Sequence, residues 1–431
     1  MSNANALALR HLLRGQRFRQ LFAVRVTSQF ADGVFQVALA SYLLFSPERQ
    51  PDAAAIAVAF AAVLLPFSVL GPFAGVFLDR WDRRQILVLS NVARAVPVLA
   101  AAAVIASGDH EPALVAVVVV AFSINRFFLA GLSAALPRVV EPDELVLANS
   151  ITPTSGTLAF ICGLAVATAL SRVTGAFGGD AAIVVLAAAV YLTAAALARR
   201  LPLSLLGPDS RTATLPDITG ELGNVATGLV AGIHHLRSRP PAAGALAVIA
   251  AHRFFYGLST VATILLYRNY FNDPDDTDAG LAGLSVAVLV SGLGFFAAAA
   301  LTPIATRRVA PHTWMLSLLG MAACVEVFPG ALYTQPSLLV AAFALGLSAQ
   351  GIKICVDTLV QTTVDDVFRG RVFSLYDVVF NVVFVAAAVV GVVVIPADGK
   401  SYPLLAAIAL GYALTAVSYA AWRRRPVGGV A

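Results

Sequence analysis

Long apolar runs separated by short polar segments dominate the chain. The runs hold about 18 to 26 residues, close to the ~20 that an α-helix needs to cross the ~30 Å hydrocarbon core of a bilayer. They predict membrane spans at residues 20–45, 53–78, 85–107, 112–136, 149–171, 181–198, 243–267, 279–301, 313–331, 337–357, 372–395 and 402–422. We therefore expect an all-α membrane protein with twelve transmembrane helices, arranged as two pseudo-symmetric six-helix bundles.

The predicted spans come as six, a polar gap, and six more. This order predicts an N-terminal bundle at 1–198, a cytoplasmic linker at 199–242 and a C-terminal bundle at 243–431. Within the linker, residues 217–236 have the pattern of an amphipathic helix lying on the membrane surface. The arginine pair at 83–84 recurs at 307–308, which indicates a parallel repeat and places substrate near the midplane between the halves.

Composition and charge support a membrane protein and set its orientation. Hydrophobic residues make up 59% of the 431 and charged residues only 12%, against roughly 25% charged in a soluble domain. Twenty of the 29 Lys and Arg residues fall on the side of the N-terminus and four on the other side. Because positive residues stay inside, we expect both termini in the cytoplasm and the chain in the plasma (inner) membrane. The net charge of +5 then reflects topology, and nucleic acid is not an expected partner.

A polar stripe interrupts the first span. Arg25, Gln29, Asp32 and Gln36 are spaced by four, three and four residues, so they share one helix face. Asp32 lies about twelve residues into the span, where an aspartate costs roughly 3 kcal/mol. We expect this face to border a water-filled cavity and to serve a proton and substrate pathway. A static ion pair, or a neutral acid in a structural hydrogen bond, is the alternative.

Other ionisable residues lie within predicted spans. Arg126, in the middle of the fourth span, is a candidate partner of Asp32, and Arg253 opens the second half's counterpart of span one, so both join the predicted pathway. Arg94 and Asp377 lie nearer the cytoplasmic face and are expected in gating or structural ion pairs. Glu326, near the outer end of span nine, fits a rim position as well as a proton site.

The loop after the second span carries the most specific motif. Its residues "GVFLDRWDRR" provide a small residue where helix ends approach, an acid that can accept hydrogen bonds from a helix N-terminus, and arginines that bind carboxylates or phosphates. They predict a cytoplasmic gating motif, which comprises Gly75, Asp79, Arg80, Arg83 and Arg84.

This motif resembles the signature loop of the major facilitator superfamily, and the resemblance runs over almost the whole chain. The stretches "RFRQLFAVRVTSQFADGVFQVAL" and "DDVFRGRVFSLYDVVFN" are similar to a bacterial branch of drug and siderophore exporters. The resemblance implies the major facilitator fold and alternating access by two rocking bundles. It also implies that Asp79 docks on the start of span eleven, and that Arg126 matches the family's span-four arginine, implicated in proton transfer.

We therefore expect a secondary active transporter that exports a small amphipathic compound (a drug, siderophore or metabolite) by proton-coupled antiport. No nucleotide-binding GxxxxGK[ST] motif is present, and the six histidines are scattered, so neither an ATP-driven pump nor an enzyme is expected. Proton-coupled import, uniport and a non-transporting scaffold or sensor stay open, because span five lacks the Gly-Pro pair usual in antiporters. The expected partners are the small-molecule substrate, protons and membrane lipid; we expect a monomer with no cofactor and no metal.

Overall fold

The computed structural model of the chain describes residues 3–39, 50, 52–61, 64, 78, 81–107, 111–174, 179–208, 225–273 and 276–424. Every long regular element in these ranges is a helix, and none of the described residues is in a strand. Nine of the helices described are long and apolar enough to cross a membrane: α5, α6, α7 and α10 to α15. The all-α membrane architecture expected from the sequence is therefore confirmed.

The helix bounds follow the predicted spans closely. The described helices are α1 (Asn3–Arg14), α2 (Gln16–Leu39), α4 (Arg83–Ser107), α5 (Glu111–Ala135), α6 (Leu145–Thr174), α7 (Gly179–Arg199), α9 (Val225–Arg237), α10 (Pro240–Leu265), α11 (Thr277–Thr306), α12 (Pro311–Val327), α13 (Gln335–Thr363), α14 (Asp366–Val394) and α15 (Tyr402–Arg423). Lipid offers no hydrogen bonds to the backbone, so a spanning segment must bond within itself as a helix.

Two predicted elements lie partly outside the described residues. In the span predicted at 53–78, residues 53–61 are helical, and most of the remainder is outside the described part. The amphipathic helix predicted at 217–236 corresponds to α9, which begins at Val225; residues 217–224 lie outside as well.

The chain forms two compact units. Unit 1 comprises Met1–Leu44, Pro66–Arg239 and Val360–Val378, and unit 2 comprises Phe45–Leu65, Pro240–Leu359 and Val379–Ala431. Each unit thus takes a segment from the other half of the sequence. The division at 198 and 243 expected from the sequence stays a prediction.

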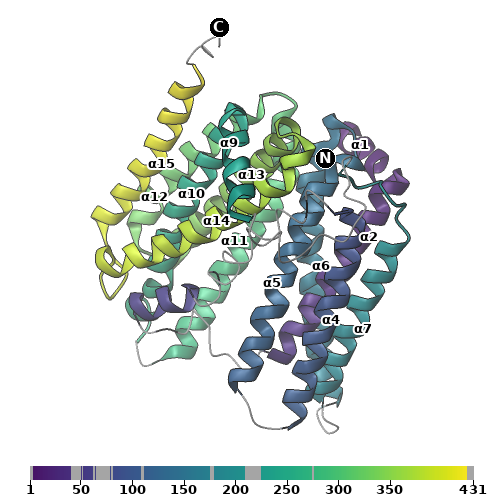
Figure 1. The fold of residues 1–431 in the computed structure, drawn as a ribbon. Helices are drawn as coiled ribbons and strands as arrows, with labels where there is room; N and C mark the ends of the chain where they lie inside the picture. Colours follow the sequence, from purple (N-terminus) through teal and green to yellow (C-terminus); the bar gives the residue numbers. More distant parts are fainter. Residues whose placement is uncertain are drawn as a thin grey trace. The chain divides into compact units, whose positions relative to one another are not determined.

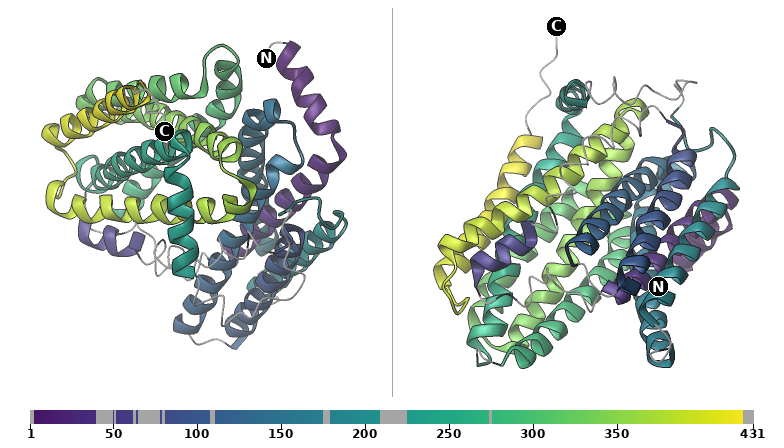
Figure 2. Two further views of the ribbon diagram at one scale, coloured as in Figure 1. Left: turned by 45° about the horizontal axis from the view of Figure 1, so that its top comes forward. Right: turned by 60° about the horizontal axis from the view of Figure 1, so that its bottom comes forward.

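Unit 1 is a helix bundle in which α2 packs against α6 and α7, and α4 packs against α5 and α7 (Figures 1 and 2). Small residues let α2 and α6 approach closely. A Cβ on Gly33 would lie 2.0 Å from the carbonyl oxygen of Phe160, and one on Gly163 would lie 2.1 Å from that of Phe30. Only glycine fits at these two crossing points, so the position of α2 is fixed by backbone contact.

Unit 2 contains α10, α11, α12 and α15, with most of α13 and the second part of α14. Within it, α15 packs against both α10 and α12, and α11 packs against α12 (Figure 1). Large apolar side chains remain exposed on the helices, such as Val393 at 86% and Leu289 at 65%. Apolar surface of this kind suits contact with lipid rather than water.

Candidate functional site

Asp32 lies in the interior of unit 1 and not on an outer face. Its residue is only 7% exposed. One carboxylate oxygen, Oδ1, accepts a hydrogen bond of 2.9 Å from Arg94 Nη1 and one of 2.5 Å from the hydroxyl of Tyr191. The other oxygen, Oδ2, is buried and has no hydrogen-bond partner among the described residues. The carboxylate is therefore held on one side only.

Arg94 is the cation of this buried pair, and its side chain is fully enclosed. Its guanidinium also donates to Asn125 Oδ1 at 2.9 Å, to Asn91 Oδ1 at 2.7 Å and to Ser28 Oγ. The rings of Phe128 and Tyr191 lie 4.6 and 4.5 Å from the guanidinium carbon. Hydrogen bonds at the edge and aromatic rings beside it are the environment that lets an arginine stay charged away from water.

The structure groups these residues differently from the sequence. Asp32 was expected beside Arg126, and Arg94 was expected in the gating group, but Arg94 is the arginine that contacts the carboxylate. Arg126 lies on α5 and is half-buried. A signal for the observed pairing is present in the sequence: Asn91 and Arg94 are spaced i, i+3 on α4, opposite Ser28 and Asp32, spaced i, i+4 on α2. Tyr191, on α7, carried no such signal.

The remainder of the polar stripe on α2 lies toward α6. A Cβ on Gly156 would come within 1.9 Å of Gln29 Oε1 and 3.0 Å of Arg25 Nε, so both side chains lie against that glycine. Gln36, toward the end of α2, is half-buried. The stripe therefore serves two contacts, since Asp32 meets α4 and α7 whereas Arg25 and Gln29 meet α6.

A second charged cluster forms around the carboxylate of Asp366, the first residue of α14. Asp366 Oδ1 accepts from Arg83 Nη1 at 2.9 Å and from Arg369 Nη1 at 2.5 Å, and Oδ2 accepts from Arg138 Nη2 at 2.6 Å. Arg83 is fully buried and also donates to the backbone oxygens of Ala134 and Leu206. This cluster, here called the Asp366 cluster, ties the start of α4 to the start of α14.

The other predicted gating residues are placed as follows. Arg84 donates to the carbonyl oxygen of Arg199 at 2.7 Å. Asp377 lies on α14 and is half-buried. Gly75, Asp79 and Arg80 lie outside the described residues. Two of the arginines that bind Asp366 are distant in the chain, Arg83 by 283 residues and Arg138 by 228, which no local pattern reveals, whereas Arg369 lies three residues after it on α14.

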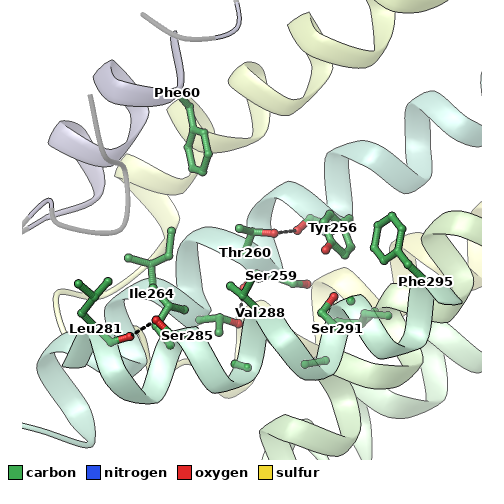
Figure 3. A pocket seen from close by; sticks show the side chains of 16 residues that line it. Phe60, Tyr256, Ser259, Thr260, Ile264, Leu281, Ser285, Val288, Ser291 and Phe295 are labelled. Atoms are coloured by element: carbon green, nitrogen blue, oxygen red, sulfur yellow. Dashed lines mark hydrogen bonds between the residues drawn. The ribbon is translucent and has the colours of Figure 1, made fainter. Parts of the chain in front are cut away.

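Unit 2 holds an apolar cavity of about 670 Å³ (Figure 3). It is lined from α10, α11 and α13, with Phe60 beside them, and none of the described lining residues is Asp, Glu, Lys, Arg or His. The lining residues are Phe60, Tyr256, Ser259, Thr260, Thr263, Ile264, Leu281, Leu284, Ser285, Ala287, Val288, Ser291, Gly292, Phe295, Ala342 and Leu345. Arg253, one turn before Tyr256 on α10, lies over the rings of Phe380 and Phe384 at 4.2 Å each.

Hydroxyl groups give the cavity its polarity. Ser259, Thr260, Thr263 and Ser285 each donate to the carbonyl oxygen four residues earlier, at 2.7 to 3.1 Å (the bonds of Thr260 and Ser285 can be followed in Figure 3). A hydroxyl has one hydrogen and two lone pairs, so a hydroxyl whose hydrogen is already used offers an acceptor. The cavity can therefore receive an apolar ligand that carries O–H or N–H donors.

Comparison with known proteins agrees with the all-α membrane architecture. The family model of the Major Facilitator Superfamily matches residues 21–388. An MFS-type transporter of Mycobacterium tuberculosis is 36% identical over 388 residues, 89% of this chain and 86% of the relative. The macrolide efflux protein A of Streptococcus pyogenes is 27% identical over 161 residues, 36% of this chain and 38% of the relative. A solved bacterial homologue of the iron transporter ferroportin, in an outward-facing state, superposes with a TM-score of 0.66 at 16% identity, covering 94% of this chain and 99% of that one.

Proposed function

The chain belongs to the major facilitator superfamily, and from that premise we propose that it is a secondary active transporter that exports a small amphipathic compound in exchange for protons. Its family is one of multi-pass membrane transporters and not of enzymes. The observation that carries the substrate class is the cavity of unit 2, which combines aromatic and aliphatic walls with hydroxyl acceptors. Its volume of about 670 Å³ lies within the usual ~300–1,000 Å³ of small-molecule sites.

The substrate class follows from the chemistry of the lining. Phe60, Tyr256 and Phe295 supply broad apolar surfaces that bind rings and chains through burial. The hydroxyl oxygens supply acceptors, while a free anion would meet no cation among the described lining residues. A macrolide is the first probe, because a distant relative is a macrolide efflux protein and such molecules combine a large apolar surface with many hydroxyl groups.

Proton coupling is assigned to Asp32. Its unpartnered oxygen, Oδ2, can take a proton without displacing a donor, and protonation cancels the charge that attracts Arg94. The buried pair thus has an ion-paired form and a form in which Asp32 is neutral and the charged Arg94 is released to its other partners. Arg25, Gln29, Gln36, Arg126 and Arg253 are proposed to line the remainder of the proton and substrate pathway.

The Asp366 cluster is assigned to gating. Three arginines hold one carboxylate at the start of α14, and one of them, Arg83, belongs to the predicted motif. Movement of the start of α14 away from the start of α4 requires these ion pairs to separate, so the cluster sets a barrier to that movement. We place this end in the cytoplasm, with both termini, in the plasma membrane. The further members of the proposed gate are Gly75, Asp79, Arg80, Arg84, Arg94 and Asp377.

The test is flux into proteoliposomes that contain the purified protein. Labelled erythromycin is added outside, and a pH gradient, acidic in the lumen, is imposed by rapid dilution. We expect gradient-dependent accumulation by the wild type and its loss in Asp32→Asn. Accumulation that is equal with and without the gradient would favour uniport, and accumulation only with the opposite gradient would favour import by symport. Either result would overturn antiport.

A further inference from the structure

Glu326 is a buried carboxyl group that the proposed mechanism leaves unused. It lies on α12 in unit 2 and is 3% exposed. Its Oε1 is 2.5 Å from the hydroxyl oxygen of Ser259 on α10. In contrast to Asp32, it forms no ion pair with any Lys, Arg or His among the described residues. Asp32 and Glu326 are therefore in different electrostatic situations.

Among the described residues, the ionisable groups that interact with Glu326 are aromatic hydroxyls. Tyr412 of α15 and Tyr333, which follows α12, are the titratable side chains in electrostatic contact with it. Two cations of unit 2 lie over aromatic rings: the ammonium of Lys400 lies over the rings of Tyr270 and Tyr333, at 4.6 and 5.4 Å. Arg253 of α10 lies over two phenylalanine rings. A buried carboxylate without a cation is costly, so the neutral, protonated acid is the stable form here.

Ser259 connects this acid to the cavity, because its side chain is also part of the cavity lining. The Ser259 oxygen lies 2.5 Å from Glu326 and 3.1 Å from the carbonyl oxygen of Phe255, yet the hydroxyl has one hydrogen to donate. When Glu326 is protonated, it can donate to Ser259 while Ser259 donates to Phe255. When Glu326 is ionised, Ser259 must turn its hydrogen to the carboxylate.

Tyr412 makes the ionised state accessible. Its hydroxyl is buried and has no hydrogen-bond partner among the described residues. A phenol that is already close to the carboxyl can donate to it once the proton has left, and this offsets part of the cost of the charge. Glu326 thus has one neighbour, Ser259, that can bond to either form and a second, Tyr412, that suits its ionised form.

We propose that Glu326 is a second proton-binding site of this transporter, in contact with the substrate cavity through the hydroxyl of Ser259. The proton passes from the carboxyl group to Ser259 Oγ as the hydroxyl hydrogen of Ser259 passes to a water molecule in the cavity, leaving a carboxylate and a hydronium ion. The inference rests on the proposed transport function, because it gives unit 2 a proton step beside the one assigned to Asp32 in unit 1.

Infrared difference spectroscopy of the full chain in lipid nanodiscs tests this directly. A protonated carboxyl group has a C=O stretching band separate from the amide bands, and the band shifts in deuterium oxide. We expect the wild type to show such a band at neutral pH and to lose it on alkalinisation. Glu326→Gln should abolish the band, whereas Asp32→Asn, the matched change at a buried acid of unit 1, should retain it.

Ser259→Ala separates the link to the cavity from the acid itself. Loss of the hydrogen bond should move the Glu326 band to higher wavenumber without removing it, and this variant gives an answer even if Glu326→Gln does not fold. A band that survives Glu326→Gln, or that is unmoved by Ser259→Ala, would overturn the proposal. The experiment uses no transported compound, so failure of erythromycin flux would overturn the proposed function and leave the proton site standing.

Discussion

Replacement of Arg94 by Met should destabilise unit 1 more than any exposed arginine change. The substitution keeps an unbranched, apolar side chain of similar length, so the lost volume is small. What it removes is the cation beside Asp32, whose own side chain is 8% exposed. Removal of one partner of a buried pair costs about 3–5 kcal/mol, because the other charge is left without compensation. We expect that loss in the free energy of unfolding.

A matched control is available on the same helix. Arg84 donates to the carbonyl oxygen of Arg199 through an exposed hydrogen bond of 2.7 Å, so Arg84→Met should cost about 1 kcal/mol or less. Both variants are unfolded with sodium dodecyl sulfate in mixed micelles, and helix content is followed by circular dichroism. The same titration on Asp32→Asn and on the double variant with both Asp32→Asn and Arg94→Met gives the coupling energy between the two side chains.

The double variant should be more stable than the sum of the single changes predicts, by about 1–3 kcal/mol, because neither charge is then left alone. Two results would refute this reasoning. One is a cost for Arg94→Met no larger than that for Arg84→Met. The other is strict additivity of the Asp32 and Arg94 changes, which would mean that the two charges do not stabilise each other.

Three further outcomes are expected. Asp366→Asn should lower the free energy of unfolding by about 2 kcal/mol or more, because it leaves three arginines without their shared carboxylate; unchanged stability in the micelle titration would contradict this. Gly33→Ala should lower the free energy of unfolding by about 1–3 kcal/mol, because its Cβ would lie 2.0 Å from the carbonyl oxygen of Phe160. Gly320→Ala, whose Cβ would have nothing within 4 Å, should leave stability unchanged or increase it. Equal effects of the two changes would be inconsistent with the α2–α6 contact. Burial lowers the pKa of His235, on α9, below its ordinary value of 6.5. The neutral imidazole therefore stabilises the folded position of α9 fully above pH 6.5, and this stabilisation is lost as the pH falls through the lowered pKa. Hydrogen exchange of α9, corrected for intrinsic rates, should therefore be faster at about pH 5 than at neutral pH, and His235→Gln should remove the difference.

The helices could be predicted from the sequence because bilayer thickness fixes their length and apolar composition marks their extent. The described helices α5 to α7 and α10 to α15 begin and end within a few residues of the predicted spans. The family, too, was indicated by residues close together in one loop and was confirmed by the match over 21–388. The helices and the motif both depend on residues that are close together in the sequence, so one sequence is enough to predict them.

The partners of the buried charges could not be predicted, because they depend on how each helix is rotated about its axis. Arg126 was the candidate partner of Asp32 and Arg94 was expected in the gating group, yet the packing of α4 against α7 brings Arg94 to Asp32. Glu326 fitted a rim position equally well, until the contact with Ser259 placed it behind the cavity wall. The cluster around Asp366 gave no complete signal, since only Arg369 is near it in sequence and Arg83 and Arg138 come from distant segments.

The most direct test of proton-coupled transport is proton movement itself. Proteoliposomes with a pH-sensitive dye in the lumen are prepared with equal pH on both sides, and erythromycin is added outside. Antiport predicts that the lumen becomes alkaline as the macrolide enters, and that the signal is absent in Asp32→Asn. An acidified lumen, or entry of labelled macrolide without any change in luminal pH, would contradict the account.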